Sequence, residues 1–152
     1  MDPADKGNWT SGEVGMGELK GTKYGVSAAA FPSLDIANLS LEQARTIAKT
    51  KYWDAFNGDS LLPAVALVVF DFAFNAGVHE AVVILQRVLG VTEDGDCGPE
   101  TQAAANCTEP KALIRRYTEA RIAFYAKLPG WPLYGRGWAK RANAAGENAL
   151  AV

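Results

Sequence analysis

The fold is decided by the stretch PAVALVVFDFAFNAG, which runs from Pro63 to Gly77. Proline suits the first turn of a helix and glycine suits the position just after its end. Between them, residues 64–76 are apolar on nearly every side, whereas a surface helix carries polar residues on its outer face. The sequence therefore predicts a central, buried helix here.

Helical patterns lie on both sides of this stretch. Ser40 and Gln43 form a capping box, which predicts a helix that ends near Trp53. Further helices are predicted after the central one, at residues 78–89, 99–106, 110–128 and 134–150. We therefore expect a single all-α domain over residues 1–152.

The first 34 residues differ from the rest, with glycine at positions 7, 12, 15, 17, 21 and 25. Glycines at that spacing make a stable helix unfavourable. We expect an irregular lobe, or a small hairpin in which residues 13–14 turn into residues 18–19. A loop region this long in a compact domain is usually functional.

Composition excludes several classes of function. The 152 residues carry 15 basic and 17 acidic side chains, a net charge of −2, which argues against a nucleic-acid partner. A carbohydrate polymer remains compatible, because hydrogen bonds and ring stacking hold it. The longest apolar run, residues 64–70, is far shorter than the roughly 18 residues that a membrane helix needs. We expect no membrane span.

The two cysteines, Cys97 and Cys107, leave two interpretations open. A bridge would close a short loop and stabilise the chain by about 2.5–3 kcal/mol, which requires Cα atoms within roughly 7 Å of each other. The alternative is two buried, reduced thiols. With His79 as the one histidine, we expect no metal site and no cofactor.

Acidic and aromatic side chains gather in the glycine-rich lobe. The acids are Asp2, Asp5, Glu13 and Glu18, and the aromatic residues are Trp9 and Tyr24. Cleavage of a glycosidic bond needs a proton donor and a second group that stabilises or attacks the cationic centre. The plainer interpretation is that these loop acids are solvated and cap turns.

Four stretches, in order, resemble the family 108 glycoside hydrolases, phage-type N-acetylmuramidases of lysozyme-like fold. They are DPADKG at 2–7, GTKYGVS at 21–27, FDFAFNAG at 70–77 and DGDCGPET at 94–101. The last is similar to a signature of the peptidoglycan-binding region found in these proteins. The resemblance implies a lysozyme-like catalytic part, residues 1–90, and a peptidoglycan-binding-like helical part, residues 91–152, packed on it.

The resemblance also implies roles for individual residues. Asp5 and Thr22 would be the catalytic residues, facing each other across one concave site. The substrate-binding residues would be Asp2, Trp9, Tyr24, Asp71 and Asn75. Asp71 and Asn75 are four residues apart and share a helical face. Asp71 either caps a neighbouring loop or contacts substrate, and on so apolar a helix it must be hydrogen-bonded.

One departure matters for activity. The family's catalytic glutamate belongs to a motif that would come just before Asp2, and Met1 stands there instead. Glu13 and Glu18 are poor substitutes, because mobile glycines surround them. We therefore expect a chain that is inactive as numbered, through a start placed too far downstream or as a true inactive sugar binder.

The expected function is that of an endolysin-like peptidoglycan hydrolase. It would cleave the β-1,4 bond between N-acetylmuramic acid and N-acetylglucosamine in bacterial peptidoglycan strands. The alternatives are a non-catalytic peptidoglycan-binding protein and a helical interaction domain. Residues 1–6 do not resemble a signal peptide, so we expect a cytoplasmic protein that reaches the cell wall when it is released at lysis.

Overall fold

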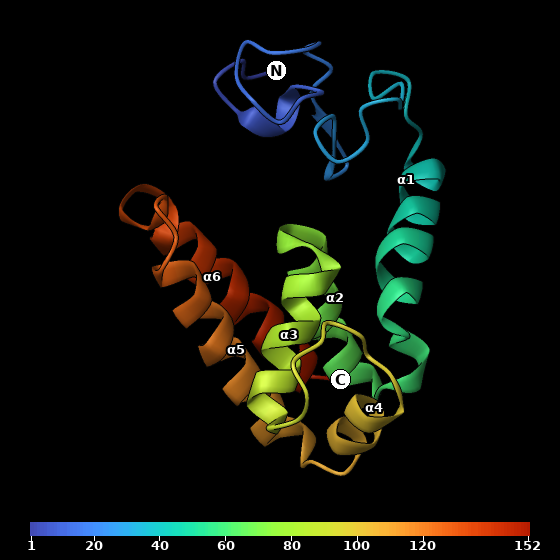
Figure 1. Ribbon diagram of the computed structural model, residues 1–152, viewed down its shortest axis with the longest axis vertical. Coiled ribbons are helices and arrows are strands. Elements are labelled where there is room, and N and C mark those ends of the chain that lie inside the picture. Colours follow the sequence, from blue (N-terminus) through green and yellow to red (C-terminus); the bar gives the residue numbers. More distant parts are fainter. The chain divides into compact units, whose positions relative to one another are not determined.

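The computed structural model describes every residue from Met1 to Val152 (Figure 1). The chain forms two compact units, Met1–Lys49 and Thr50–Val152. Six α-helices and one two-stranded hairpin confirm the predicted helical fold class with a small hairpin in the N-terminal lobe. None of the helices combines the length and the apolar character needed to cross a lipid bilayer.

The first unit is mostly irregular. Its elements are the 3₁₀ turn η1 (Lys6–Asn8), the strands β1 (Thr22–Lys23) and β2 (Val26–Ser27), and helix α1 (Leu41–Ala48). The two strands pair antiparallel. The predicted capping box is confirmed at the start of α1, where Gln43 N donates to Ser40 Oγ and Ser40 N donates to Gln43 Oε1.

The hairpin lies later in the chain than predicted. Its two-residue turn consists of Tyr24 and Gly25, whose φ angles are 53° and 80°. Positive φ at both positions is typical of a type I′ turn, which matches the twist of paired strands, although tyrosine rarely adopts a positive φ. The hairpin predicted at residues 13–19 is wrong, because no strand forms there. Leu19 pairs with Trp9 in an isolated bridge only.

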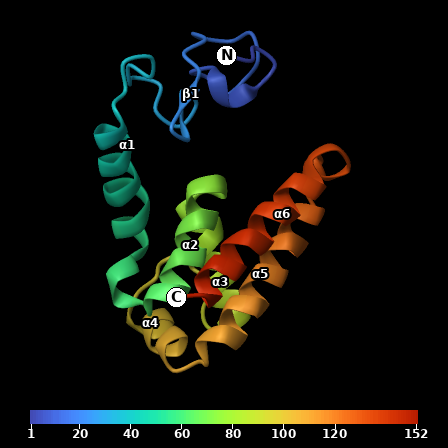
Figure 2. The same cartoon turned by 180° about the vertical axis from the view of Figure 1, so that it is seen from behind.

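The second unit is built around helix α2. Its elements are η2 (Lys49–Trp53, which crosses the boundary between the units), η3 (Asp54–Phe56), η4 (Gly58–Ser60), α2 (Pro63–Ala76), α3 (Val78–Leu89), α4 (Pro99–Asn106), α5 (Pro110–Ala126) and α6 (Trp131–Leu150). Helix α2 contacts α3, α5 and α6, as the two views of the ribbon show (Figures 1 and 2). The predicted central helix is therefore confirmed.

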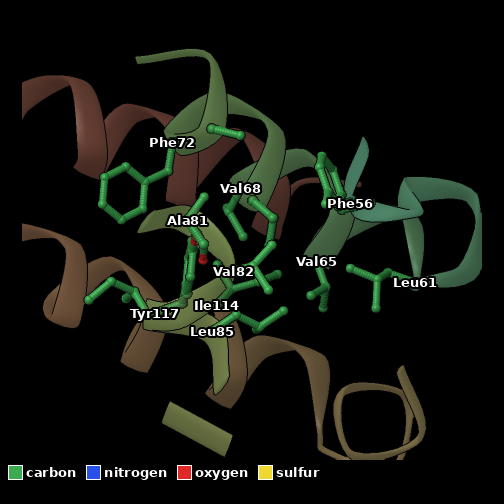
Figure 3. Packing of buried hydrophobic residues seen from close by; sticks show 14 of the residues in the cluster. Phe56, Leu61, Val65, Val68, Phe72, Ala81, Val82, Leu85, Ile114 and Tyr117 are labelled. Atoms are coloured by element: carbon green, nitrogen blue, oxygen red, sulfur yellow. The ribbon is translucent and has the colours of Figure 1, made fainter. Parts of the chain in front are cut away.

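Packing in the second unit explains why α2 is apolar on all sides. Val65, Val68 and Phe72 of α2 lie in one cluster with Val82 of α3 and Tyr117 of α5 (Figure 3). Phe72 is fully buried. Burial of one such side chain contributes about 1.5–3 kcal/mol, so this cluster is the main source of stability in the unit.

Helix α6 begins three residues before its predicted start. Proline breaks a helix in its interior, but Pro132 occupies the first turn, where no intrahelical N–H is required. Gly135 lies against the Trp131 ring, since a Cβ at position 135 would come within 2.5 Å of it. The glycine therefore admits the large ring at the start of the helix.

The Asp94–Gly98 turn is organised by the buried side chain of Gln86. Its Nε2 donates to Asp94 Oδ1 at 2.8 Å and to Thr101 Oγ1 at 3.1 Å, and its Oε1 accepts from Gly95 N at 2.9 Å. The turn and the start of α4 are therefore held together by one buried amide, and the hydroxyl of Thr101 is an acceptor in this arrangement.

Of the two interpretations of the cysteines, the bridge is absent; both thiols are free, although only Cys97 is buried and Cys107 is exposed. Helix α4 separates them, and its eight residues rise about 12 Å, well beyond the reach of a bridge. Closeness in sequence misled the prediction, because a helix between two cysteines holds them apart. No group of three or more His, Cys, Asp or Glu side chains is placed to hold a metal ion.

Candidate functional site

A pocket of about 400 Å³ lies within the first unit and brings together the two predicted catalytic residues. Asp5, Asn8, Thr22, Lys20, Lys23 and Met1 contribute to its wall, with Gly21, Ile36 and Ala37. Asp5 comes from the start of η1 and Thr22 from β1, so two separate segments meet here. The pocket is therefore the candidate site, and Asp5 is its one carboxylate.

Asp5 is oriented by its own turn. It is the N-cap of η1, and its Oδ1 accepts the N–H of Gly7 at 2.8 Å. A Cβ at position 7 would come within 3.2 Å of the same oxygen, so glycine leaves room for the carboxylate. The local sequence thus fixes one oxygen of Asp5 by a backbone hydrogen bond.

Asn8 joins the segments of the site by hydrogen bonds, a role that was not predicted from the sequence. Its side chain is only 6% exposed; Nδ2 donates to Asp2 O at 2.7 Å, and Oδ1 accepts from Thr22 Oγ1 at 2.8 Å. Its backbone oxygen accepts from the N–H groups of Lys20 and Gly21. Asparagine in a glycine-rich loop was the available signal, because a short amide can bond its own backbone surroundings.

Two predicted substrate-binding residues, Asp2 and Trp9, hold the loop instead of lining the pocket. Asp2 Oδ1 accepts from Ala4 N at 2.9 Å, and Trp9 Nε1 donates to Pro3 O at 2.8 Å. Neither is among the residues that form the wall. Their roles in substrate binding stay predictions.

Tyr24 lies next to the pocket wall without being part of it. Its ring is 51% exposed, and the ammonium of Lys23, which does belong to the wall, lies 5.5 Å from the ring centre. The positive φ of Tyr24 follows from its place in the hairpin turn. The structure thus puts this aromatic ring beside Lys23, one residue of the pocket wall.

Two lysines bring positive charge to the same pocket. Lys20 Nζ donates to Pro32 O at 2.8 Å, and Lys23 Nζ donates to Ala37 O at 3.0 Å. Lys20 also pairs with the exposed carboxylate of Glu18 at 3.3 Å. Glu18 is largely exposed and is not among the residues of the wall, which argues further against a role as proton donor.

The nearest additional acid is Asp35, which lines a neighbouring pocket with Met1. Hydrogen bonds from the side chain and backbone of Asn38 hold the pKa of Asp35 below its ordinary value. A lowered pKa keeps this carboxyl ionised at neutral pH. Asp35 is thus unsuited to donate a proton there.

Asp71 and Asn75 belong to the second unit and lie at the two ends of a chain of hydrogen bonds. Asp71 accepts from Arg121 Nη1 at 2.6 Å and from Arg141 Nη2 at 3.2 Å. Arg121 Nε donates to the hydroxyl of Tyr125, which in turn donates to Asn75 Oδ1. The prediction that Asp71 must be hydrogen-bonded is confirmed, and its partners are two arginines, not a loop.

The comparisons with known proteins cover both units. Residues 1–77 match the family model described as Glycosyl hydrolase 108, and residues 80–143 match the one described as Predicted Peptidoglycan domain. No curated protein sequence matches the chain.

A solved structure agrees with the family matches. It is described as "Structure of Brucella abortus SagA" and has a TM-score of 0.81 and 30% sequence identity, covering 86% of this chain and 79% of that chain. The pocket of Asp5 and Thr22 lies wholly within the first matched segment. These findings confirm the resemblance drawn from the four motifs, and the chain belongs to the glycosyl hydrolase 108 family.

Proposed function

We propose that the pocket of Asp5 and Thr22 is the cleavage site of a peptidoglycan hydrolase that acts on the β-1,4 bond between N-acetylmuramic acid and N-acetylglucosamine. The observation that carries the proposal is the meeting of these two side chains at one pocket within the segment that matches the hydrolase family. A second segment that matches a peptidoglycan domain supports the choice of substrate.

Asp5 supplies the charge that the reaction needs. Breaking a glycosidic bond builds positive charge on the sugar ring, and a carboxylate stabilises that charge or positions the attacking water. The bond from Gly7 N holds one oxygen of Asp5, so the carboxylate meets the substrate in a fixed orientation. Preorganised groups of this kind need no reordering at the moment of reaction.

Thr22 orients a water molecule or a substrate hydroxyl opposite Asp5. Its hydroxyl hydrogen is directed to Asn8 Oδ1, so the lone pairs of its oxygen stay available as acceptors. Asn8 is a positioning residue, because it acts on the reaction through Thr22.

The side chains of the pocket wall do not include a proton donor separate from Asp5. Asp5 is the one carboxylate in the pocket wall, and two separate groups are needed for general acid help and charge stabilisation. We propose that residues 1–152 alone bind glycan and hydrolyse it poorly, because general acid–base help is worth about 10²–10⁴-fold in rate. The family's glutamate, supplied by a segment joined before Met1, would complete the site.

A non-catalytic peptidoglycan-binding protein is the second candidate. The single carboxylate of the pocket and the match of residues 80–143 to a peptidoglycan domain favour it. In either case the place of action is the cell wall. For the hydrolase we propose an endolysin-like route, with the protein held in the cytoplasm until lysis.

The test compares the 152-residue chain with a chain extended by the family's glutamate motif. Release of soluble fragments from purified peptidoglycan should rise at least about 100-fold on extension and fall back when that glutamate becomes glutamine. Asp5→Asn in the extended chain should also lower the rate, whereas Glu42→Gln, exposed on α1 and outside the pocket wall, is the matched control. An extended chain that binds peptidoglycan without cleaving it would establish the binding protein instead.

A further inference from the structure

An exposed aromatic pair lies at the start of helix α6, outside the pocket described above. Tyr134 is 59% exposed, and its ring centre is 5.8 Å from that of Trp138. Trp138 in turn packs on the buried ring of Tyr125 at 5.4 Å. Tyr134 therefore keeps more than half of its surface open to solvent beside a half-buried ring.

The turn before α6 is shaped to fit these rings. A Cβ at Gly130 would come within 2.8 Å of Trp138 and 3.2 Å of Tyr134. Glycine is therefore the residue that lets the backbone approach both rings closely. The pair is held between this turn and Tyr125, so little conformational freedom is lost when a ligand stacks on it.

Fixed polar groups continue from the aromatic pair. Tyr125, beneath Trp138, receives a hydrogen bond from Arg121 Nε at 3.0 Å, and Arg121 and Arg141 both pair with Asp71. Arg121 is 2% exposed, and its Nη2 is buried without a hydrogen-bond partner. Arg141 is nearly half exposed, so its guanidinium can also donate to a bound molecule.

The charge of this segment points to an acidic ligand. Residues 127–141 hold four basic side chains (Lys127, Arg136, Lys140 and Arg141) and no acidic one, in a chain whose net charge is −2. Arg136 and Lys140 are exposed. Arg141 follows Trp138 by three residues and therefore lies on the same face of α6 as the aromatic pair. An aromatic face beside a cation suits a sugar ring that carries carboxylates.

We propose that Tyr134 and Trp138 form a second glycan-binding site, which stacks one sugar ring of peptidoglycan while Arg141, on the same face of α6, contacts the carboxylates of its peptide stem. The substrate class rests on the function proposed above. The site itself rests on the second unit alone, and it acts as an anchor that holds the strand independently of the cleavage pocket.

The experiment measures equilibrium binding to the full 152-residue chain with two probes. One is a soluble disaccharide–peptide fragment of peptidoglycan, and the other is a neutral tetramer of N-acetylglucosamine. Tyr134→Ala should weaken binding of both about 3- to 10-fold, because stacking is lost. Tyr134→Phe keeps the ring and should bind like the unchanged chain.

Two variants separate stacking and charge from general damage. Leu133→Ala removes the neighbouring side chain, which is 82% exposed, and should leave both affinities unchanged. Arg141→Gln should weaken binding of the acidic fragment alone. Unchanged binding by Tyr134→Ala, equal loss in Leu133→Ala, or no binding of either probe to the unchanged chain would overturn the site. Cleavage by the extended chain decides the proposed function separately.

Discussion

The two units of this protein are stabilised in different ways. The core of the first has four buried apolar residues, Val26, Ile36, Leu39 and Ala44, and its loops are joined by hydrogen bonds through Asn8. The second has a large apolar cluster around α2. The pocket therefore belongs to the unit with the smaller core, where polar contacts set the geometry.

This difference predicts unequal responses to substitution. In the second unit, loss of apolar volume should cost the most stability, because packing dominates there. In the first unit, loss of a single hydrogen-bonding side chain should disturb the pocket without unfolding the helices. Each of the following variants breaks or sharpens this comparison, beginning with the largest expected effect.

Phe72→Ala should lower the free energy of unfolding of the second unit by about 3–5 kcal/mol, because it leaves a cavity against Tyr117, Phe124 and Tyr125. Urea denaturation followed by far-ultraviolet circular dichroism measures the change. Leu133→Ala is the control, and its exposed position should keep its effect within about 0.5 kcal/mol. Similar losses in both variants would contradict the importance of packing around α2.

Asn8→Ala should cost about 1–3 kcal/mol within the first unit, since it removes the partner of Thr22 and of Asp2 O. Hydrogen exchange should speed up at the amides of Lys20 and Gly21, which donate to Asn8 O, and stay unchanged in α2. Equal acceleration in α2 would show that the two units do not unfold separately.

The two thiols of the unchanged, folded chain should differ in their reactivity. Burial, helped by the charge of Asp96, raises the pKa of Cys97 to about 11. At pH 8 only about a thousandth of it is thiolate, and its reactivity should increase as pH rises toward that value. A thiol reagent at pH 8 should label Cys107 rapidly and Cys97 slowly. Equal labelling rates would show that Cys97 is not buried.

The sequence predicted the helical unit well and the irregular unit only in outline. Helices 78–89 and 99–106 match their predicted bounds, because caps, glycines and apolar spacing are local signals. The position of the hairpin depends on the positive φ of Tyr24, which cannot be predicted from the presence of a tyrosine. The start of α6 was missed because Pro132 is tolerated in a first turn.

The candidate site was predictable where a motif marks it and not where contacts define it. Asp5 and Thr22 stood out through the family resemblance, and the structure brings them to one pocket. Asn8 could not be assigned beforehand, because its role depends on segments that meet only in the folded unit. For the same reason, the pairing of Asp71 with Arg121 and Arg141, 50 and 70 residues away, left no trace in local spacing.

The most direct measurement is the identity of the sugar ends that the extended chain releases from peptidoglycan. Mass spectrometry should find new reducing ends on N-acetylmuramic acid, formed at a rate that Asp5→Asn and Thr22→Val both lower, while Glu42→Gln changes nothing. New ends on N-acetylglucosamine, or a rate indifferent to Asp5 and Thr22, would contradict the assignment of this pocket as the cleavage site.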